Sequence, residues 1–207
     1  AIAQGQLPQQ SWFALGRQLT SVGNSAILMS WSGSVFEYLM PLLVMPEYDN
    51  TLLSQTNEAL IKKEMEYGKK KNTPWGISES GYNMFDAQLN YQYRAFGVPG
   101  IGLKRGLGED LVIAPYATLM ALMVAPEDAY DNLIQMKELG FEGDYGFYEA
   151  IDYTTSRLTS KQKYKVIKSF MSHHQGMGML AIHFLLTDKL MQQRFAADIQ
   201  MQSALLL

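Results

Sequence analysis

Cysteine is absent from the 207 residues of the chain, which excludes disulfide bonds and thiolate chemistry and leaves the cellular compartment open. Only three histidines are present, so we expect no zinc or other metal site. A GxSxG nucleophile elbow and a nucleotide-binding fingerprint are both missing, and we expect no cofactor. The net charge of −3 gives no electrostatic reason to expect nucleic acid or an anionic membrane surface as a partner.

Long apolar runs are also scarce. The longest, Leu111 to Ala125, is interrupted by Pro115 and is shorter than the roughly 18–20 residues that a membrane-spanning helix requires. We therefore expect a buried, central helix from Leu111 to Val124, for which Asp110 is a candidate N-cap. No signal peptide is recognisable, and the chain starts without methionine, which indicates excision or processing.

The rest of the composition is that of a soluble chain with a core. Hydrophobic residues make up 47% and charged residues 18% of the sequence, a balance typical of globular proteins and not of disordered ones. No internal repeat, low-complexity tract or linker is recognisable. We therefore expect residues 1–207 to form a single unit.

Helical patterns occur along the whole chain. Leu7 to Gly16 can form a short helix, and Phe36 to Met45 is an apolar segment in which Pro41 marks a kink or a helix start. Thr51 to Lys71 has a clearer helical pattern and ends in three lysines, where the helix dipole favours cations. Its predicted buried stripe consists of Leu53, Thr56, Leu60 and Tyr67.

Two further helices are expected in the second half of the chain. One begins at Pro126, with Glu127 and Asp128 in its first turn, and ends at Gly140. The last has the i, i+3, i+4, i+7, i+8 pattern of one buried face, formed by Met177, Leu180, Ala181, Phe184 and Leu185.

Long polar segments rich in aromatic residues and glycine separate these helices. Thr73 to Asp110 and Phe141 to Leu158 are too long for simple connections. Long loops on a helical scaffold commonly carry function. The pattern predicts a mainly all-α fold, a helical toroid with its site at one end, in which these segments contain loops and short strands.

The long segments contain the groups that bind sugars. Carboxylates, amides and arginine hydrogen-bond sugar hydroxyls, and aromatic rings stack on the sugar face. Glycosidic cleavage usually adds two carboxyl groups across the bond. The chemistry of these segments therefore indicates a carbohydrate-active site.

Glu79 is the first candidate for a catalytic carboxyl group. It lies between Trp75 and Tyr82, and such an apolar environment can raise the pKa of a carboxyl group and suit it to act as a general acid. The alternative is a glutamate that is hydrogen-bonded to backbone amides of its own loop.

Glu149 and Asp152 are the candidates in the second long segment, beside Tyr148. In an extended strand, residues 149 and 152 point to opposite faces, so both acids serve one site only if the chain turns. The alternative is a pair of buried carboxylates that accept hydrogen bonds from backbone donors.

A glycine-rich stretch from Gly97 to Asp110 lacks the order of a phosphate-binding loop. We expect instead a shaped loop whose charged side chains hold one another or a sugar: Lys104, Arg105, Glu109 and Asp110.

Two polar clusters are weaker candidates. The adjacent residues His173 and His174 point about 100° apart on a helix and cannot both bind one metal, but either could bond a sugar hydroxyl together with Gln175. Glu37 lies three residues after Ser34, the spacing of a capping box, and is either a helix cap or a site carboxylate.

Five strings carry a resemblance to a known family. They are WSGSVFEYLMPLL, TPWGISESGYN, NYQYRAFGVPGIGLKRGLGEDLVIAPYAT, GDYGFYEAIDYTTSRL and SFMSHHQGMGMLA. In this order they resemble the glucoamylase-like domain of cyclic β-1,2-glucan synthases, from about Gly5 to the end of the chain. Each string is long and unusual, so the resemblance is specific.

The resemblance implies a fold and a reaction. The family fold is an (α/α)6 toroid, of which this chain, with too few helical patterns for a whole one, would form the later part. The family's parent proteins are large bacterial inner-membrane synthases, so this segment would be a soluble domain on the cytoplasmic side, beside the other domains of the synthase. The implied reaction is a transglycosylation that closes a β-1,2-glucan chain on its own end.

The resemblance also implies roles for the acidic positions. Glu79 and Glu149 are the predicted cleaving pair, and no metal is expected. The residues predicted to bind the sugar are Glu37, Trp75, Tyr82, Tyr93, Arg105, Glu109, Asp110, Tyr148, Asp152, His173, His174 and Gln175. Hydrolysis of the same glucan, a non-catalytic glucan-binding module and a self-associating inactive fragment remain open alternatives.

Overall fold

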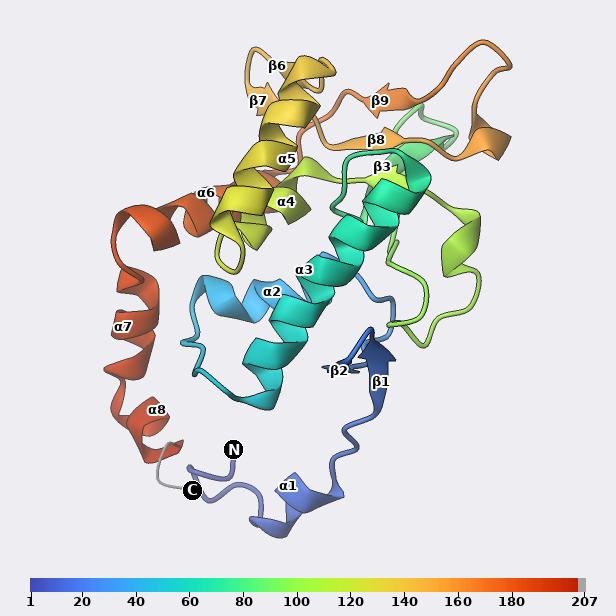
Figure 1. Ribbon diagram of the computed structural model, residues 1–207. Coiled ribbons are helices and arrows are strands. Elements are labelled where there is room, and N and C mark those ends of the chain that lie inside the picture. The colour runs from blue at the N-terminus through green and yellow to red at the C-terminus, as the bar shows by residue number, and fades with distance from the viewer. Residues whose placement is uncertain (205–207) are drawn as a thin grey trace.

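The computed structural model describes residues 1–204 as a mainly helical chain with small antiparallel sheets (Figure 1). The α-helices are α1 (Gln10–Ala14), α2 (Val35–Leu39), α3 (Leu52–Lys71), α4 (Pro115–Ala121), α5 (Pro126–Glu138), α6 (Ser172–Leu186), α7 (Leu190–Ala196) and α8 (Ile199–Ala204). The short 3-10 helices are η1 (Met40–Leu43), η2 (Leu107–Glu109) and η3 (Thr155–Arg157). The predicted mainly helical class is confirmed.

The strands form one sheet of three strands and three hairpins. They are β1 (Leu19–Val22), β2 (Ser25–Leu28), β3 (Ser80–Phe85), β4 (Tyr91–Arg94), β5 (Val112–Ile113), β6 (Glu142–Gly143), β7 (Gly146–Phe147), β8 (Ala150–Asp152) and β9 (Lys165–Ile167). The three-stranded sheet has the order β5-β8-β9, and β3 pairs with β4. The two long polar segments therefore contain the short strands expected there.

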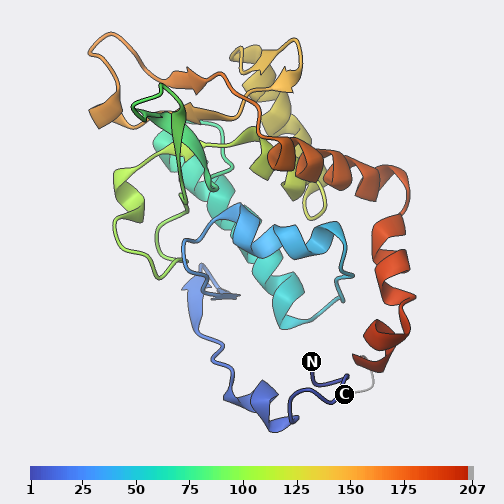
Figure 2. The same ribbon diagram turned by 180° about the vertical axis from the view of Figure 1, so that it is seen from behind.

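The long helix α3 crosses the middle of the molecule, and the hairpin strand β2 packs against it (Figures 1 and 2). Thr51 and Ser54 form a capping box at its start, and Asn72 ends it in the left-handed conformation. The predicted helix over Thr51–Lys71 is confirmed, but Leu53 is 62% exposed and does not belong to the buried stripe. The buried face of α3 instead includes Asn57, Leu60, Ile61, Glu64 and Gly68.

The apolar stretch from Leu111 to Val124 is not one helix, contrary to the prediction. Its first residues form strand β5, which pairs with β8, and α4 begins only at Pro115. Proline has no backbone N–H and fits the first turn of a helix, where that donor has no partner. Asp110 is therefore not an N-cap.

Helix α4 packs against α2, α5 and α6, and these helices contribute much of the apolar core. Helix α5 begins at Pro126, and Gly140 follows its end with a φ of +80°, as predicted. On α6, Met177 and Ala181 are buried, whereas Leu185, from the same predicted stripe, is exposed. No helix in the described residues is long and apolar enough to cross a membrane.

The two ends of the described chain lie close together at one side of the molecule (Figure 1). Gln4 Nε2 donates a hydrogen bond of 2.6 Å to Gln200 Oε1. Helices α7 and α8 lead from the end of α6 to this contact (Figure 2).

Candidate active site

Glu79, Tyr93 and His174 meet where the β3–β4 hairpin reaches the first turn of α6. The Tyr93 hydroxyl donates to Glu79 Oε2 at 3.2 Å and lies 3.3 Å from His174 Nε2. His174 Nδ1 lies 2.9 Å from Glu149 Oε2. A continuous hydrogen-bonded line, which we call the carboxylate line (Glu79, Tyr93, His174, Glu149), thus joins the two predicted catalytic carboxyl groups.

The two ends of the carboxylate line differ in exposure. Glu149 is 2% exposed and His174 is 1% exposed, whereas Tyr93 is 41% exposed. Glu149 Oε1 also accepts a 3.0 Å hydrogen bond from the Gly81 amide, so both oxygens of this carboxylate are used inside the protein. Glu79 is half-buried, and only its end of the line is open to a substrate.

The carboxylate line can hold one proton in two places. In one arrangement a protonated Glu79 donates to Tyr93, which donates to His174 Nε2. In the other, Tyr93 donates to an ionised Glu79 and accepts from a doubly protonated His174. Donor roles at His174 depend on its tautomer, and in both arrangements Nδ1 donates to Glu149.

The aromatic neighbours of His174 fix its ring. Tyr116 stacks on the imidazole with ring centroids 3.7 Å apart and planes 9° apart. The Tyr116 hydroxyl donates to Ser78 Oγ at 2.8 Å and to the Glu79 carbonyl at 2.9 Å. One tyrosine therefore holds both the imidazole and the backbone of Glu79.

Burial and nearby charge keep the phenol of Tyr93 neutral. Partial burial, followed by the neighbouring Glu79 carboxylate, raises the Tyr93 pKa above its usual value. Burial and the adjacent imidazole of His174 lower the pKa of His173. A neutral phenol can both donate and accept a hydrogen bond, which is what a group between a carboxyl and an imidazole must do.

Trp75 does not face the site. Its ring is buried in the core, its backbone amide donates to Asn132 Oδ1, and its backbone carbonyl accepts from the Asn132 side-chain amide and from the Thr118 hydroxyl. A buried indole offers no face to a sugar. Trp75 instead anchors the segment of residues 73–79, which we call the Glu79 loop.

Asp152 belongs to a second cluster and not to the carboxylate line. Its carboxylate accepts from Arg157 Nε at 2.7 Å and from the Asn83 amide at 3.0 Å, and its exposure is 0%. Arg157 also pairs with Asp110, and Asp110 pairs with Arg94 at 3.2 Å. Although burial opposes its charge, hydrogen bonds to the two aspartates raise the pKa of Arg157.

The extended backbone explains the separation of the two acids. Glu149 accepts from the amide of Gly81, and Asp152 accepts from the amide of Asn83, two residues further along β3. The predicted alternative, carboxylates that satisfy backbone donors, describes Asp152 well. Tyr82 packs against this cluster, with its ring 4.9 Å from the Arg157 guanidinium.

Glu37 is a structural carboxylate. It completes the capping box with Ser34 and accepts further hydrogen bonds from Ser30 and Ser32. Partial burial would raise its pKa, but the hydrogen bonds from Ser32, Ser30 and Ser34 lower it. The capping interpretation of Glu37 is confirmed.

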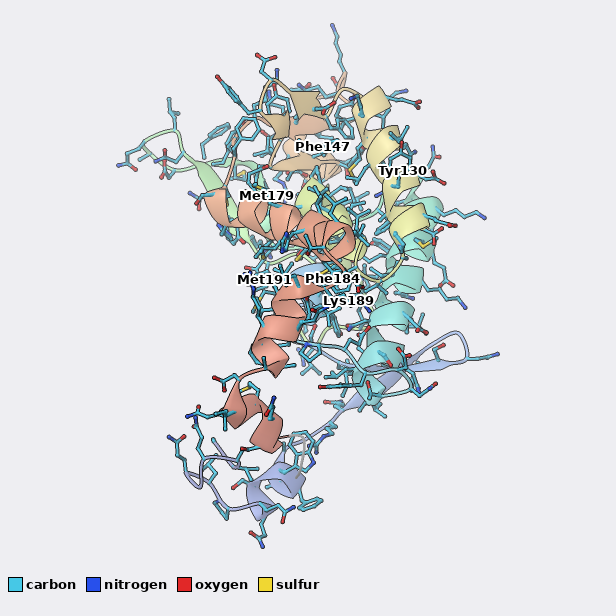
Figure 3. All side chains as sticks on the ribbon, turned by 90° about the vertical axis from the view of Figure 1, so that its left-hand side faces the viewer. Tyr130, Phe147, Met179, Phe184, Lys189 and Met191 are labelled. Carbon is cyan, nitrogen blue, oxygen red and sulfur yellow. The ribbon has the colours of Figure 1, made fainter. Side chains whose placement is uncertain are left out.

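The other predicted sugar-binding residues lie around the site or away from it. His173 is exposed beside His174, with ring centroids 4.0 Å apart. Gln175 donates to the Phe147 carbonyl at 3.3 Å, and Phe147 lies beside α6 (Figure 3). Tyr148 is half-buried, packs on Phe170 and lies directly before Glu149.

Arg105 and Glu109 are exposed on the glycine-rich loop. Within residues 1–204, neither side chain forms a hydrogen bond or an ion pair with the carboxylate line. Within the same residues, no group of three or more acidic, histidine or cysteine side chains could hold a metal ion.

Sequence reasoning missed three residues that hydrogen-bond the segments around the site: Tyr116, Arg157 and Glu64. Tyr116 lies inside an apolar stretch and Arg157 follows Asp152 by five residues, so neither position indicated a contact with the site. The position of Glu64 did indicate burial, because Glu64 lies four residues after Leu60 and three after Ile61, on the buried face of the helix.

Comparisons with known proteins show the family to which the chain belongs. The Glycoamylase family model, whose description reads "putative glucoamylase", matches residues 3–198. The cyclic β-(1,2)-glucan synthase NdvB of Rhizobium meliloti is 44% identical over 207 residues, which is all of this chain and 7% of that protein.

Solved structures share the fold. An endo-β-1,2-glucanase from Chitinophaga pinensis matches 91% of this chain and 45% of its own with a TM-score of 0.65 and 15% identity. An endo-β-1,2-glucanase from Talaromyces funiculosus matches 98% of this chain and 44% of its own with a TM-score of 0.61 and 15% identity. At this identity the likeness concerns the fold alone, and the chain spans less than half of each of these proteins.

Proposed function

Because this chain belongs to the Glycoamylase family, we propose that it carries the reacting groups of an active site that acts on β-1,2-linked glucan. The carboxylate line is the observation that supports the proposal. It places an accessible carboxyl group, Glu79, in contact with a phenol that is linked to a buried imidazole–carboxylate pair. General acid–base cleavage of a glycosidic bond requires such a proton-donating carboxyl group together with a second carboxylate.

The proposed reaction is a transglycosylation that cyclises the glucan. The identity of 44% to a cyclic β-(1,2)-glucan synthase supports it. Because a β-linkage is broken and a β-linkage is made, the mechanism retains configuration. Glu79 would protonate the departing glucan oxygen while Glu149 attacks the anomeric carbon, and Glu79 would then take a proton from the glucan's own 2-hydroxyl as that hydroxyl displaces Glu149.

Hydrolysis with inversion is the second candidate, and the position of Glu149 favours it. A nucleophilic carboxylate needs an oxygen open to the anomeric carbon, but Glu149 is buried and both of its oxygens accept hydrogen bonds. The pair of Glu149 and His174 could instead accept a proton from an attacking water. A retaining pair of carboxyl groups is about 5–5.5 Å apart and an inverting pair roughly 6.5–9.5 Å.

We further propose that the chain is the later part of an (α/α)6 domain within a larger protein. The coverage of less than half of the two glucanase structures supports this proposal. Its partners would be a β-glucan chain and the other domains of a bacterial inner-membrane synthase, with this segment on the cytoplasmic side. Exposed apolar residues on α6, including Met179 and Leu186, favour self-association if the chain is studied alone.

Mass spectrometry of the products formed from linear β-1,2-glucan tests the proposal. The protein containing this chain would be compared with its Glu79→Gln and Glu149→Gln variants. Products one water lighter than the linear glucan, lost in both variants, are expected for cyclisation. Shortened linear products would identify a hydrolase, and no product from a folded protein would leave only a glucan-binding role.

A further inference from the structure

Glu64 is a carboxyl group inside the protein that has no part in the carboxylate line. It lies on the buried face of α3 and its exposure is 0%. Its Oε2 accepts hydrogen bonds from the backbone amides of Gly76 at 3.2 Å and Ile77 at 2.9 Å. Among the described residues, its Oε1 is buried without a hydrogen-bond partner.

Burial determines the protonation of Glu64. Removal from water outweighs the two amide hydrogen bonds and raises its pKa to about 8. At neutral pH the group is therefore mostly a neutral carboxylic acid. In this form its carbonyl oxygen accepts from the two amides, and no uncompensated charge is buried.

The two amides belong to the Glu79 loop. Gly76 has a φ of +118°, and a Cβ at this position would lie 2.7 Å from Thr118 Oγ1, so the backbone passes close to α4. Without Glu64, the N–H groups of Gly76 and Ile77 would have no acceptor in a buried environment, which is costly.

Other polar groups of the Glu79 loop form hydrogen bonds with more distant parts of the chain. The Val35 amide donates to the Ile77 carbonyl at 3.2 Å, and Ser78 Oγ accepts from the Phe36 amide at 3.0 Å. The Glu79 carbonyl accepts from Tyr116. Among these acceptors, only Glu64 Oε2 accepts hydrogen bonds from two consecutive amides. Glu64 therefore fixes both the position and the direction of the loop.

We propose that Glu64 is a positioning residue that holds the Glu79 loop so that the Glu79 carboxyl group stays in contact with Tyr93 and with the substrate. The proposal rests on the proposed function for its catalytic consequence. Its structural part, the anchoring of Gly76 and Ile77, is measurable without any substrate.

Two variants separate anchoring from charge. Glu64→Gln keeps an acceptor oxygen for the two amides and, like the protonated acid, has a donor at the other position. Glu64→Leu keeps a similar volume but offers no acceptor. Glu66→Leu makes the same change at an exposed position of α3 and serves as the matched control.

The kinetic test measures kcat and KM on linear β-1,2-glucan for the protein containing this chain. We expect Glu64→Leu to lower kcat about 100-fold, the size of effect that a misplacement of about 1 Å can have, with KM within about threefold. Glu64→Gln should keep kcat within about threefold of the wild type. An unchanged kcat in Glu64→Leu would overturn the proposal. A loss of kcat in Glu64→Gln or in Glu66→Leu as large as that in Glu64→Leu would overturn it as well.

The structural test uses Trp75, which lies in the Glu79 loop. In the protein containing this chain, the Trp75 emission is obtained as the difference between the spectra of two proteins that are identical except for Trp75→Phe, so that the emission of all other tryptophans, Trp12 and Trp31 among them, cancels. This emission should shift to longer wavelength in Glu64→Leu and stay unchanged in Glu64→Gln and Glu66→Leu. An unshifted emission in a folded Glu64→Leu variant would also overturn the anchoring.

Two further outcomes are decided by independent measurements. If Glu64→Leu does not fold, as judged by circular dichroism, Glu64→Asp replaces it, since the shorter acid is polar but cannot reach both amides. If the wild type is inactive on glucan, the proposed function falls alone. Hydrogen exchange of the Gly76 and Ile77 amides then decides the anchoring: equal exchange in the wild type and in Glu64→Leu (or its replacement Glu64→Asp) contradicts it, and faster exchange in the variant supports it.

Discussion

The segments that carry Glu79 and Glu149 are held in opposite ways. In the Glu79 loop, buried side chains of α3, α4 and α5 fix the backbone, while the Glu79 side chain stays accessible. At Glu149 the side chain itself is fixed, by the Gly81 amide and His174. Two glutamates in similar aromatic segments therefore differ in access: the Glu79 carboxyl group is half-buried and open to solvent, and the Glu149 carboxyl group is buried and linked to Glu79 through His174 and Tyr93.

Replacing Glu79 should have the largest effect. Glu79→Gln removes the proton donor but keeps the shape and the contact to Tyr93, so we expect activity on β-1,2-glucan to fall about 10²–10⁴-fold. Glucan binding, measured by calorimetry, should change little. A rate within about tenfold of the wild type would show that the accessible end of the carboxylate line is not the acid.

Replacing Glu149 distinguishes the two candidate mechanisms. If Glu149 acts as a base through His174, then Glu149→Ala and His174→Ala should each lower the rate about 100-fold, the double variant should lose little more, and proton NMR should show a first product of inverted configuration. If Glu149 is the nucleophile, the first product should keep the β configuration, and Glu149→Ala should lose far more activity than His174→Ala.

The sequence predicted the elements whose signals are local. The caps and proline positions at Thr51, Ser34 and Pro126 are readable from neighbouring residues, and these helix starts were placed correctly. The Leu111–Val124 segment was not, because its first residues pair with β8, about 40 residues away. Local apolar periodicity does not show which partner strand covers such residues.

The same limit applies to the candidate site. Residue types identified Glu79, Tyr93, Glu149 and His174 as candidates, and the structure brings all four together. Residue types also selected Trp75, Asp152 and Glu37, which hydrogen-bond other parts of the protein. The sequence could not show this, because nothing in a single sequence indicates which polar groups fold onto a given residue. Glu64 was missed because a carboxylate within a helix is ordinarily a solvated one.

The pH dependence of the stability of the protein tests the burial of Glu64, a carboxyl group in a third kind of environment. Its pKa of about 8 in the folded chain lies above the ordinary value of 4.5. The folded state therefore binds the proton more tightly, so this contribution to stability is complete below pH 4.5 and is lost as the pH rises toward 8.

Glu64→Gln removes this dependence. Between pH 5 and pH 8 we expect the wild type to lose stability relative to the variant by on the order of a few kcal/mol at most, measured by urea unfolding at each pH. The exposed control Glu66→Gln should follow the wild type. Parallel curves for the wild type and Glu64→Gln would mean that Glu64 is ionised in the folded chain.

We expect the smallest effects on activity from substitutions in the glycine-rich loop. Arg105 and Glu109 are exposed, and an exposed side chain away from such contacts usually changes the free energy by less than about 0.5 kcal/mol. Arg105→Ala and Glu109→Gln should therefore each alter the rate on β-1,2-glucan less than about threefold, as measured beside Glu79→Gln in one assay. A larger rise in KM for either variant, at unchanged kcat, would show that the loop contacts the bound glucan. The sugar-binding role predicted from the sequence for Arg105 and Glu109 would then be correct, although neither side chain contacts the carboxylate line.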